Sequence, residues 1–474
     1  MIEITLQEAA AVVGGSLRGA ADPQARIRGV SIDTRTLKPG NLFVPIAGAQ
    51  FDGHDFVQEG VRAQASAALW QADRGMPPES GAVIVVDDTT AALQRLAAAY
   101  RRRLRARVIG ITGSNGKTTT KDMTAAALAS AYKVHKTTGN LNNHWGLPLT
   151  LLQVPEDADF AVVEMGMSGR GEIARLSAIA RPDAAVVTNI GEAHLMQLGS
   201  REAIAAAKLE IVEGLADGGL LVYRGDEPLL EQGLRAIGGR AKALPTACRI
   251  RFGESADNDW YPTAILMDAD GTRFTLNGMP DRPLAIPLWG RHNVVNAVAA
   301  VAVARHYGVS WDGIMSGLAQ LKPTGMRADV IRAANGVTVL NETYNASPTA
   351  MRAALTLLGD LQGFRRKFAV LGDMLELGEQ EAAYHAAIGR ELNPRDIHWV
   401  LTYGKLAAQI AAAAGERYPT GHVQIFQDKE ALVRALLQLT SAGDLVLVKG
   451  SRGMKMEEIV EAYLRAAGGG RERR

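Results

Sequence analysis

Short runs of apolar residues alternate with stretches of helical periodicity along most of this chain. In the first hundred residues, apolar runs at 65–70 and 82–86 predict strands, and the spacing of apolar positions at 91–104 predicts a helix. From residue 108 onward a strand, a glycine-containing loop, a helix and another strand follow one another. Because parallel strands need crossover connections such as helices, this alternation predicts α/β domains with mostly parallel sheets.

The alternation changes character twice, which predicts three domains. Strand and turn signals are dense between 220 and 288, and an Ala/Val-rich stretch at 293–307 predicts a helix that ends this part. A Pro and Gly cluster at 322–327 interrupts the pattern before strand and helix signals resume. We therefore expect a small N-terminal α/β domain at 1–105, a central phosphate-loop domain with a mostly parallel sheet at 106–320, and a Rossmann-like α/β domain at 321–474.

Composition and charge narrow the class of protein. Of the 474 residues 47% are hydrophobic and 22% charged, which is typical of a globular protein, and the net charge of +2 argues against nucleic-acid binding. The sequence lacks an apolar run of membrane-spanning length, so we expect a cytoplasmic protein without membrane insertion. The single cysteine, Cys248, excludes an intrachain disulfide, and we expect it to be buried. The absence of a coiled-coil pattern favours a monomer.

The clearest chemical signal is the stretch GSNGKTT at residues 113–119, between a predicted buried strand and a predicted helix. Its glycines let backbone N–H groups approach phosphate oxygens, and the helix N-terminus adds a favourable dipole. Lys117 is expected to neutralise outer phosphates, and the Thr118 hydroxyl to bind Mg²⁺. The strict phosphate-loop motif requires glycine at the position of Ile111, so this loop is a variant, and a chance glycine-rich turn is the alternative interpretation.

Three residues beyond the loop carry weaker signals. Glu164 ends the apolar run at 160–163, so it is expected at the carboxyl end of a parallel strand, where ligands bind and a carboxylate suits Mg²⁺. His194 follows another predicted strand, and for a single histidine a structural role and a binding role are equally open. Lys208 lies on a predicted helix at 202–215 and, taken by itself, is interpreted as a surface lysine.

These residues and their neighbours resemble the Mur ligase family, and within it the MurF type, which adds D-alanyl-D-alanine to the cytoplasmic peptidoglycan precursor. The segments similar to the whole family are GSNGKTT at 113–119, TTGNLNN at 137–143, GRHNVVNA at 290–297 and VKGSR at 448–452. The segments similar to the MurF type are FDGH at 51–54, EMGMSGRGEI at 164–173 and LGDMLELG at 371–378. The resemblance covers nearly the whole chain.

The resemblance implies an ATP-dependent amide ligase that acts on UDP-N-acetylmuramoyl-tripeptide and D-alanyl-D-alanine with two Mg²⁺ ions. It implies that Thr118 and Glu164 hold one ion, and that His194 and a carbamylated Lys208 organise the second. The implied catalytic residues are Lys117, His194, Lys208 and Arg327. The implied nucleotide-binding residues are Gly113, Ser114, Asn115, Gly116, Lys117, Thr118, Thr119, Asn293, Asn296, Arg327 and Glu342. The implied substrate-binding residues are Ser31, Asp33, Thr34, Arg35, Asp52, Gly53, His54, Asn140, Asn142, Asn143, Asp373, Lys449, Ser451 and Arg452.

One segment departs from the family pattern, because the family's DSYNANP reads ETYNASP at 342–348. The longer carboxylate of Glu342 can reach the same ribose or water from a shifted backbone, so we retain it as a site residue. In such ligases ATP activates a carboxylate as an acyl phosphate, and we expect the third domain to rotate onto the central domain and exclude water. The alternatives are a sister Mur or folylpolyglutamate-type ligase, and a phosphate-loop NTPase that forms no amide.

Overall fold

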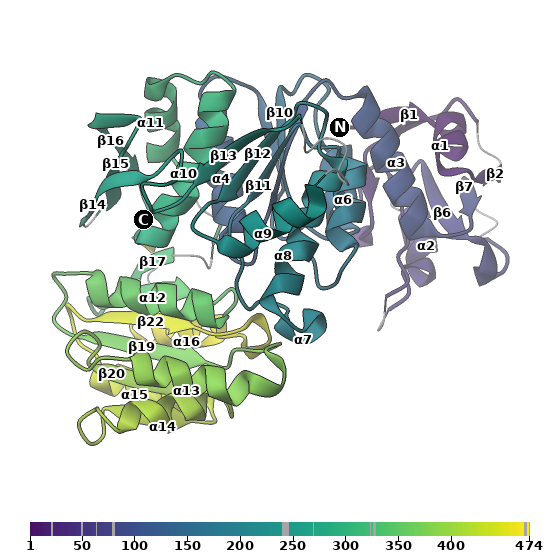
Figure 1. The fold of residues 1–474 in the computed structure, drawn as a ribbon. Helices are drawn as coiled ribbons and strands as arrows, with labels where there is room; N and C mark the ends of the chain where they lie inside the picture. The colour runs from purple at the N-terminus through teal and green to yellow at the C-terminus, as the bar shows by residue number, and fades with distance from the viewer. Residues whose placement is uncertain are drawn as a thin grey trace.

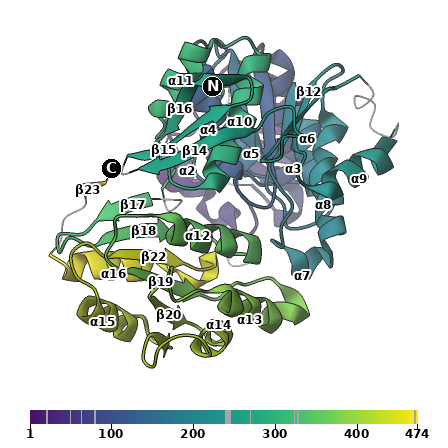
Figure 2. The same cartoon turned by 60° about the vertical axis from the view of Figure 1, so that its left-hand side comes forward.

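The computed structural model describes residues 1–19, 22–48, 51–62, 64–77, 81–238, 246–268, 270–322, 324–325, 329–468 and 472–473. The chain forms three α/β regions that follow one another in sequence (Figures 1 and 2). The predicted α/β class with mostly parallel sheets is confirmed. Among the described helices, none has the length and apolar character that crossing a membrane requires.

The N-terminal region is built on a five-stranded sheet with the order β2-β7-β6-β5-β4. The apolar runs predicted as strands form its centre, β6 (Ala67–Gln71) and β7 (Val83–Val86). The remaining strands are β1 (Glu3–Thr5), β2 (Ser16–Arg18), β3 (Arg26–Arg28), β4 (Val30–Ser31) and β5 (Leu42–Phe43). The helices are α1 (Leu6–Val13), α2 (Val57–Arg62) and α3 (Thr89–Arg103).

The central region contains a six-stranded sheet, in which all neighbouring strands are parallel, with the order β13-β12-β11-β8-β10-β9. Its strands are β8 (Arg107–Thr112), β9 (Val134–Lys136), β10 (Phe160–Glu164), β11 (Ala184–Val187), β12 (Leu220–Arg224) and β13 (Cys248–Phe252). Both faces are covered, because Val108 and Ile109 on β8 belong to different apolar cores. Near-continuous apolar runs are typical of such strands.

Eight helices and a small antiparallel sheet complete the described part of the central region. The helices are α4 (Lys117–Ala129), α5 (Gly146–Leu152), α6 (Glu172–Ala180), α7 (Leu195–Leu198), α8 (Arg201–Leu209), α9 (Pro228–Ile237), α10 (Arg291–His306) and α11 (Trp311–Ala319). The sheet is formed by β14 (Pro262–Asp268), β15 (Gly271–Leu276) and β16 (Met279–Ile286). Two predictions are wrong here: α11 follows α10, and Cys248 is exposed because β13 is an edge strand.

The C-terminal region has a seven-stranded sheet with the order β21-β20-β19-β22-β18-β17-β23. Its strands are β17 (Asp329–Arg332), β18 (Thr338–Glu342), β19 (Lys367–Gly372), β20 (Trp399–Tyr403), β21 (Val423–Phe426), β22 (Leu445–Lys449) and β23 (Glu472–Arg473), of which β17 and β23 pair antiparallel. One face is covered by α12 (Pro348–Asp360), α13 (Glu381–Glu391) and α14 (Ala407–Gly415), and the other by α15 (Lys429–Leu439) and α16 (Glu457–Ala466).

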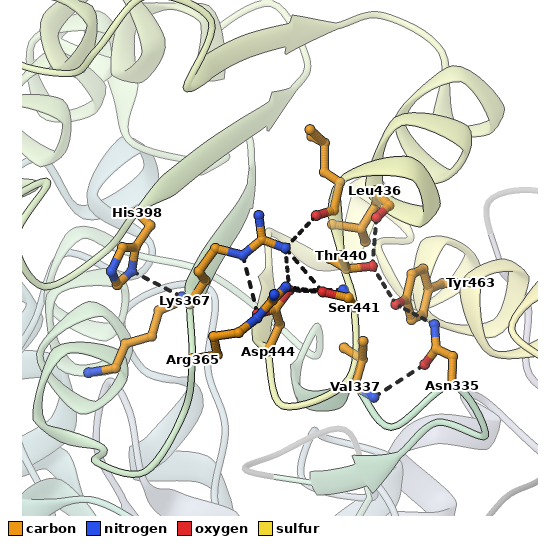
Figure 3. A network of polar contacts seen from close by, with 12 residues as sticks. Asn335, Val337, Arg365, Lys367, His398, Leu436, Thr440, Ser441, Asp444 and Tyr463 are labelled. Atoms are coloured by element: carbon orange, nitrogen blue, oxygen red, sulfur yellow. Dashed lines mark hydrogen bonds and ion pairs between the residues drawn. The ribbon is translucent and has the colours of Figure 1, made fainter.

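A buried carboxylate fixes the amino ends of two central strands of this sheet (Figure 3). The Asp444 side chain, which has no exposed surface, precedes β22, and it accepts hydrogen bonds from Arg366 Nη2 at 2.7 Å, Arg365 Nε at 3.1 Å and Ser441 N at 2.9 Å. Both arginines precede β19, so the network holds β19 beside β22. The opposite, carboxyl ends of these strands are thereby aimed together at one edge of the sheet.

The three regions are joined in different ways. The N-terminal and central regions share one apolar core, in which Leu96 and Tyr100 of α3 belong to the same cluster as Leu151 of α5. Arg101 of α3 reinforces this junction by donating to Ala180 O at 2.7 Å and to the Asp183 carboxylate at 2.9 Å. The C-terminal region has a core on each face of its sheet, and one of these cores includes Trp289 of the central region. The two regions also meet around the cavity described next and between the loops that carry His194 and Glu376.

Candidate active site

A cavity of about 450 Å³ lies between the central and C-terminal regions. The central region contributes the loop at 113–119 and the start of α10, and the C-terminal region contributes the strand ends of β18 and β22 and one side of α12 along its length. The residues predicted from the sequence that line it are Ser114, Asn115, Gly116, Lys117, Thr119, Asn293, Asn296, Glu342 and Lys449. Ala350, Ala353 and Leu357 of α12 give the cavity an apolar wall.

The loop between β8 and α4 has a backbone that only glycine fits at two positions. Gly113 has a φ of 148°, and a Cβ there would lie 1.8 Å from Thr188 Oγ1. Gly116 has a φ of 78°, and a Cβ there would lie 2.6 Å from Asn296 Oδ1. Positive φ values and close approach both favour glycine. Because α4 begins at Lys117, this loop presents the N-terminus of a helix to the cavity, which suits phosphate groups.

The segment that follows β11 braces this loop. Ser114 Oγ accepts a hydrogen bond from Gly191 N at 2.9 Å, and Asn189 Oδ1 accepts one from Asn115 N at 2.9 Å. Lys117 Nζ folds back to donate to Gly113 O at 2.9 Å. Asn189 was missed by the sequence reasoning, although its place directly after the strand end at Thr188 was an available signal.

Thr118 and Glu164 meet behind the loop, from the start of α4 and the carboxyl end of β10. Thr118 Oγ1 donates to Glu164 Oε2 at 2.6 Å, and Asn142 Nδ2 donates to Glu164 Oε1 at 2.8 Å. Glu164 is 1% exposed. Within the described ranges, no three His, Cys, Asp or Glu side chains are grouped to share a metal ion. A carboxylate and a hydroxyl fit Mg²⁺, which takes few protein oxygens and completes its shell with water and phosphate.

Lys208 lies at the end of α8 and is buried, so its interpretation as a surface lysine is wrong. In the part of the chain that the structure describes, its ammonium has no hydrogen bond or ion pair. Burial lowers the pKa of Lys208 well below its ordinary value, and the nearby Lys117 lowers it further. This shift favours the neutral amine, which is the form that reacts with CO₂ to give a carbamate.

His194 precedes α7 with a left-handed backbone, at φ 66°. Its Nδ1 lies 3.0 Å from Glu376 Oε2 of the C-terminal region. Burial lowers the pKa of His194, Glu376 opposes this shift, and Lys208 and Lys117 add to it. His194, Lys208 and Lys117 therefore lie close enough for their charges to interact.

At the C-terminal side of the cavity, a buried ion pair accommodates the departure at residue 342. Lys449, 3% exposed, lies at the end of β22, and its Nζ is 3.2 Å from Glu342 Oε2 at the end of β18. The same ammonium donates to Asn345 O at 3.1 Å. The longer acid therefore reaches across the strand ends to the lysine.

Asp373, Ser451 and Arg452 are placed away from the cavity lining. Asp373 Oδ1 accepts from Ala407 N at 2.7 Å and so caps the start of α14, and Ser451 Oγ accepts from Leu375 N at 2.9 Å. Arg452 pairs with Glu457 at 2.8 Å, with 55% of its side chain exposed. The first contact ties the loop after β19 to α14, and the second holds this loop against the end of β22. Arg327 lies outside the described residues.

A second cavity, of about 1260 Å³, lies in the N-terminal region against the edge of the central region. The predicted residues that line it are Ser31, Asp33, Thr34, Arg35 and Gly53. Asp52 and His54 lie beside it instead. His54 is buried, and its Nδ1 is 2.7 Å from Asp52 Oδ1, while the other oxygen of Asp52 pairs with Arg74 at 2.8 Å. These contacts fix the loop that presents Gly53.

The segment 140–143 connects the wall of the larger cavity to Glu164. Leu141 lines the larger cavity, and the next residue, Asn142, donates to Glu164. Asn143 Oδ1 accepts from Gly146 N at 2.8 Å and fixes the start of α5, while Asn140 is exposed.

The structure has three regions with mostly parallel sheets, a variant phosphate loop at the carboxyl end of a central strand, and a third region across the cavity from that loop. These features define a three-domain nucleotide-binding enzyme. Family descriptions agree: "Mur ligase family, catalytic domain" matches residues 26–101, "Mur ligase middle domain" matches 111–304, and "Mur ligase, glutamate ligase domain" matches 326–452. The chain belongs to the Mur ligase family.

Similar proteins within this family are of the MurF type. The chain is 47% identical to the UDP-N-acetylmuramoyl-tripeptide--D-alanyl-D-alanine ligase of Bacillus subtilis (strain 168), over 97% of this chain and 98% of that protein. A crystal structure of MurF from Acinetobacter baumannii superposes with a TM-score of 0.85 at 30% identity, over 98% of this chain and 99% of that one. MurF from Thermotoga maritima in complex with ADP gives a TM-score of 0.80 at 30% identity, over 93% and 98%.

Proposed function

We propose that this protein is an ATP-dependent ligase that joins D-alanyl-D-alanine to UDP-N-acetylmuramoyl-tripeptide in peptidoglycan precursor synthesis. The observation that carries the proposal is the pair of cavities, one with a phosphate loop and one of a size for a nucleotide sugar. Their walls are connected through Glu164, which accepts hydrogen bonds from Asn142 and Thr118. The full-length identity to the Bacillus subtilis ligase supports the same substrates, and the ADP-bound Thermotoga maritima structure supports ATP as the phosphoryl donor.

In this reaction the terminal carboxylate of the tripeptide attacks the γ-phosphorus of ATP and forms an acyl phosphate, and ADP leaves. The amine of the dipeptide then attacks the acyl carbon, the amide bond forms, and inorganic phosphate leaves with loss of a proton from the amine. The first step depends on positioning and on neutralising charge. Lys117, with the N–H groups of residues 113–119, is suited to hold the phosphates, and Arg327 is proposed to reach the γ-phosphate.

Four side chains are proposed to hold Mg²⁺. Thr118 and Glu164 would bind one ion through their oxygens, and His194 with a carbamate on Lys208 would bind the second. Bound Mg²⁺ supplies charge neutralisation on the transferred phosphoryl group. A neutral Lys208 amine adds to CO₂ with release of one proton, and the resulting carbamate places a negative charge where the folded chain otherwise presents two lysines, Lys117 and Lys208.

Water must be kept from the acyl phosphate, and contacts across the first cavity support a closing C-terminal domain. Thr349 Oγ1 of α12 donates to Glu192 Oε2 at 2.7 Å, and Asn115 Nδ2 lies 3.4 Å from Ser347 Oγ. We propose the domain limits 1–105, 106–320 and 321–474. Thr324, just after the second limit, still contacts the central region, because its hydroxyl donates to the Asp122 carboxylate of α4 at 2.7 Å. A monomer remains our expectation.

The test measures ADP release with UDP-N-acetylmuramoyl-tripeptide, with and without D-alanyl-D-alanine, together with mass analysis of the product. We expect sustained ADP release only when both are present, and one amide formed per ADP. Lys117→Ala should abolish both signals without loss of fold. Amide formation with glutamate or a diamino acid in place of the dipeptide would favour a sister ligase. ADP release at the same rate with and without the two substrates would favour a simple NTPase.

A further inference from the structure

Glu376 and His194 meet across the boundary between the C-terminal and central regions. Glu376 lies in the loop after β19, and its Oε2 is 3.0 Å from His194 Nδ1. The backbones are also joined, because Met196 N donates to Glu376 O at 3.0 Å. A Cβ added at Gly378 would lie 3.6 Å from Met196 Cα, so the two loops are in close contact. The position of the Glu376 carboxylate is therefore set from both its own loop and its neighbour.

Both residues adopt a backbone conformation that side chains other than glycine rarely take. His194 has a φ of 66° and Glu376 a φ of 65°. Among the described residues only five that are not glycine have a positive φ, and two of them touch each other here. A left-handed conformation costs a non-glycine residue on the order of 1–3 kcal/mol and tends to be kept where function requires it. This pairing of two such residues calls for a reason beyond chance packing.

Stability does not supply that reason. The Glu376 side chain is 50% exposed and the His194 side chain 27% exposed. Ion pairs of this exposure contribute only about 0–1 kcal/mol, since solvent screens the charges and side-chain entropy is lost. Orientation of the His194 imidazole does explain the pairing. A histidine that binds a metal through one ring nitrogen is oriented when its other ring N–H is donated to a carboxylate, and such carboxylates are important for metal affinity.

We propose that Glu376 is a positioning residue for His194, delivered by the C-terminal domain, so that the second Mg²⁺ site is complete only when the two domains are together. The inference rests on the proposed function, in which His194 serves that ion. His194 Nδ1 and Glu376 Oε2 are at ion-pair distance, and among the described residues the structure shows no hydrogen bond at Nδ1. Donation of Nδ1–H to Glu376 is part of the proposal, and it would leave the lone pair of Nε2 for the metal. Closure of the C-terminal domain and competence of the second metal site then become one event.

The test titrates Mn²⁺ into the full-length protein with an ATP analogue whose β,γ-bridge cannot be cleaved. Free Mn²⁺ is measured by electron paramagnetic resonance for the wild type, Glu376→Gln, Glu376→Ala and Glu379→Gln. Glu379 is an exposed carboxylate three positions along the same loop, so its variant is the control for charge. We expect two bound ions in the wild type and the control. In the Glu376 variants one ion should bind about 10–100-fold more weakly, more so in Ala than in Gln, while the other is unchanged.

The steady-state reaction provides a second measurement. In the Glu376 variants the Mg²⁺ concentration for half-maximal turnover should rise. At saturating Mg²⁺, KM for ATP should equal that of the wild type and kcat should be restored. Two outcomes overturn the proposal: a wild type that binds a single Mn²⁺ ion, and equal Mn²⁺ affinities in the wild type and the Glu376 variants. Equal affinities overturn it even if solution scattering shows that the domains of the variants are more loosely associated. Because the titration uses nucleotide and metal alone, its failure is distinct from failure of the wild type to form the amide.

Discussion

Glu164→Gln should separate the stability of this protein from its activity. The Glu164 carboxylate is 1% exposed and accepts hydrogen bonds from Thr118 at 2.6 Å and Asn142 at 2.8 Å. Among the described residues, no lysine or arginine forms an ion pair with it. The buried carboxylate is therefore stabilised by hydrogen bonds and by its electrostatic interaction with the buried Lys121.

The two consequences of the substitution have different sizes. A hydrogen bond to a charged group contributes about 1.5–3 kcal/mol and one to a neutral group about 1 kcal/mol, so weakening two bonds costs about 1–4 kcal/mol. Relief of the buried charge offsets a cost of similar size. The free energy of unfolding should therefore change by less than about 2 kcal/mol, which shifts Tm by at most about 8 °C. Loss of a metal carboxylate should lower kcat/KM at least 100-fold, or about 3 kcal/mol.

The assay compares ADP release and thermal unfolding of the wild type, Glu164→Gln and a control. Glu231→Gln is the matched control, because that carboxylate also accepts a hydroxyl, from Tyr223, and lines neither cavity. The control should keep its activity. Turnover of Glu164→Gln within threefold of the wild type at low Mg²⁺ would refute the reasoning, and a large fall in Tm would show that the carboxylate serves the fold instead.

Three further outcomes follow from the geometry. Gly116→Ala should weaken ADP binding about tenfold by calorimetry, because its Cβ would meet Asn296 Oδ1 at 2.6 Å, whereas Gly218→Ala, equally left-handed but in open space, should bind normally. Asp444→Asn should lower the free energy of unfolding by about 2–4 kcal/mol at pH 7 in urea titrations. Burial opposes ionisation of Asp444, but hydrogen bonds from Arg365, Arg366 and Ser441 N outweigh burial and lower the pKa of Asp444 below its ordinary value of 3.8. The stability advantage of the wild type is therefore complete above pH 3.8 and is lost as the pH falls through the lower pKa of the folded state. Arg35→Ala should raise KM for the nucleotide-sugar substrate at unchanged KM for ATP, and equal changes in both would contradict separate cavities.

Much of the fold was predictable because its signals are local. The apolar run at 160–163 formed β10 within one residue, since a strand covered by helices on both faces must be apolar along its length. The helix predicted at 202–215 was too long. It ends as α8 at Leu209 and continues as a tighter turn to Gly214, a difference that depends on how the segment packs.

The candidate site was predictable only in part. The loop at 113–119 could be predicted from the sequence, because positive φ values and close neighbours require glycine at positions 113 and 116. Asp52 and His54 were assigned to substrate, yet the structure uses them to hold a loop beside the cavity. A short segment indicates which residues are unusual, but it does not indicate which way their side chains point.

The sequence by itself determined the α/β class, the phosphate loop and the strand end that carries Glu164, because periodicity and glycine conformation are properties of neighbouring residues. Only the tertiary structure decided that Lys208 is buried, that Lys449 forms an ion pair with the longer Glu342, and that Glu376 approaches His194 from another domain. Burial and charge pairing depend on groups that lie up to hundreds of residues apart. They exist only after the sheets have packed and brought those residues together.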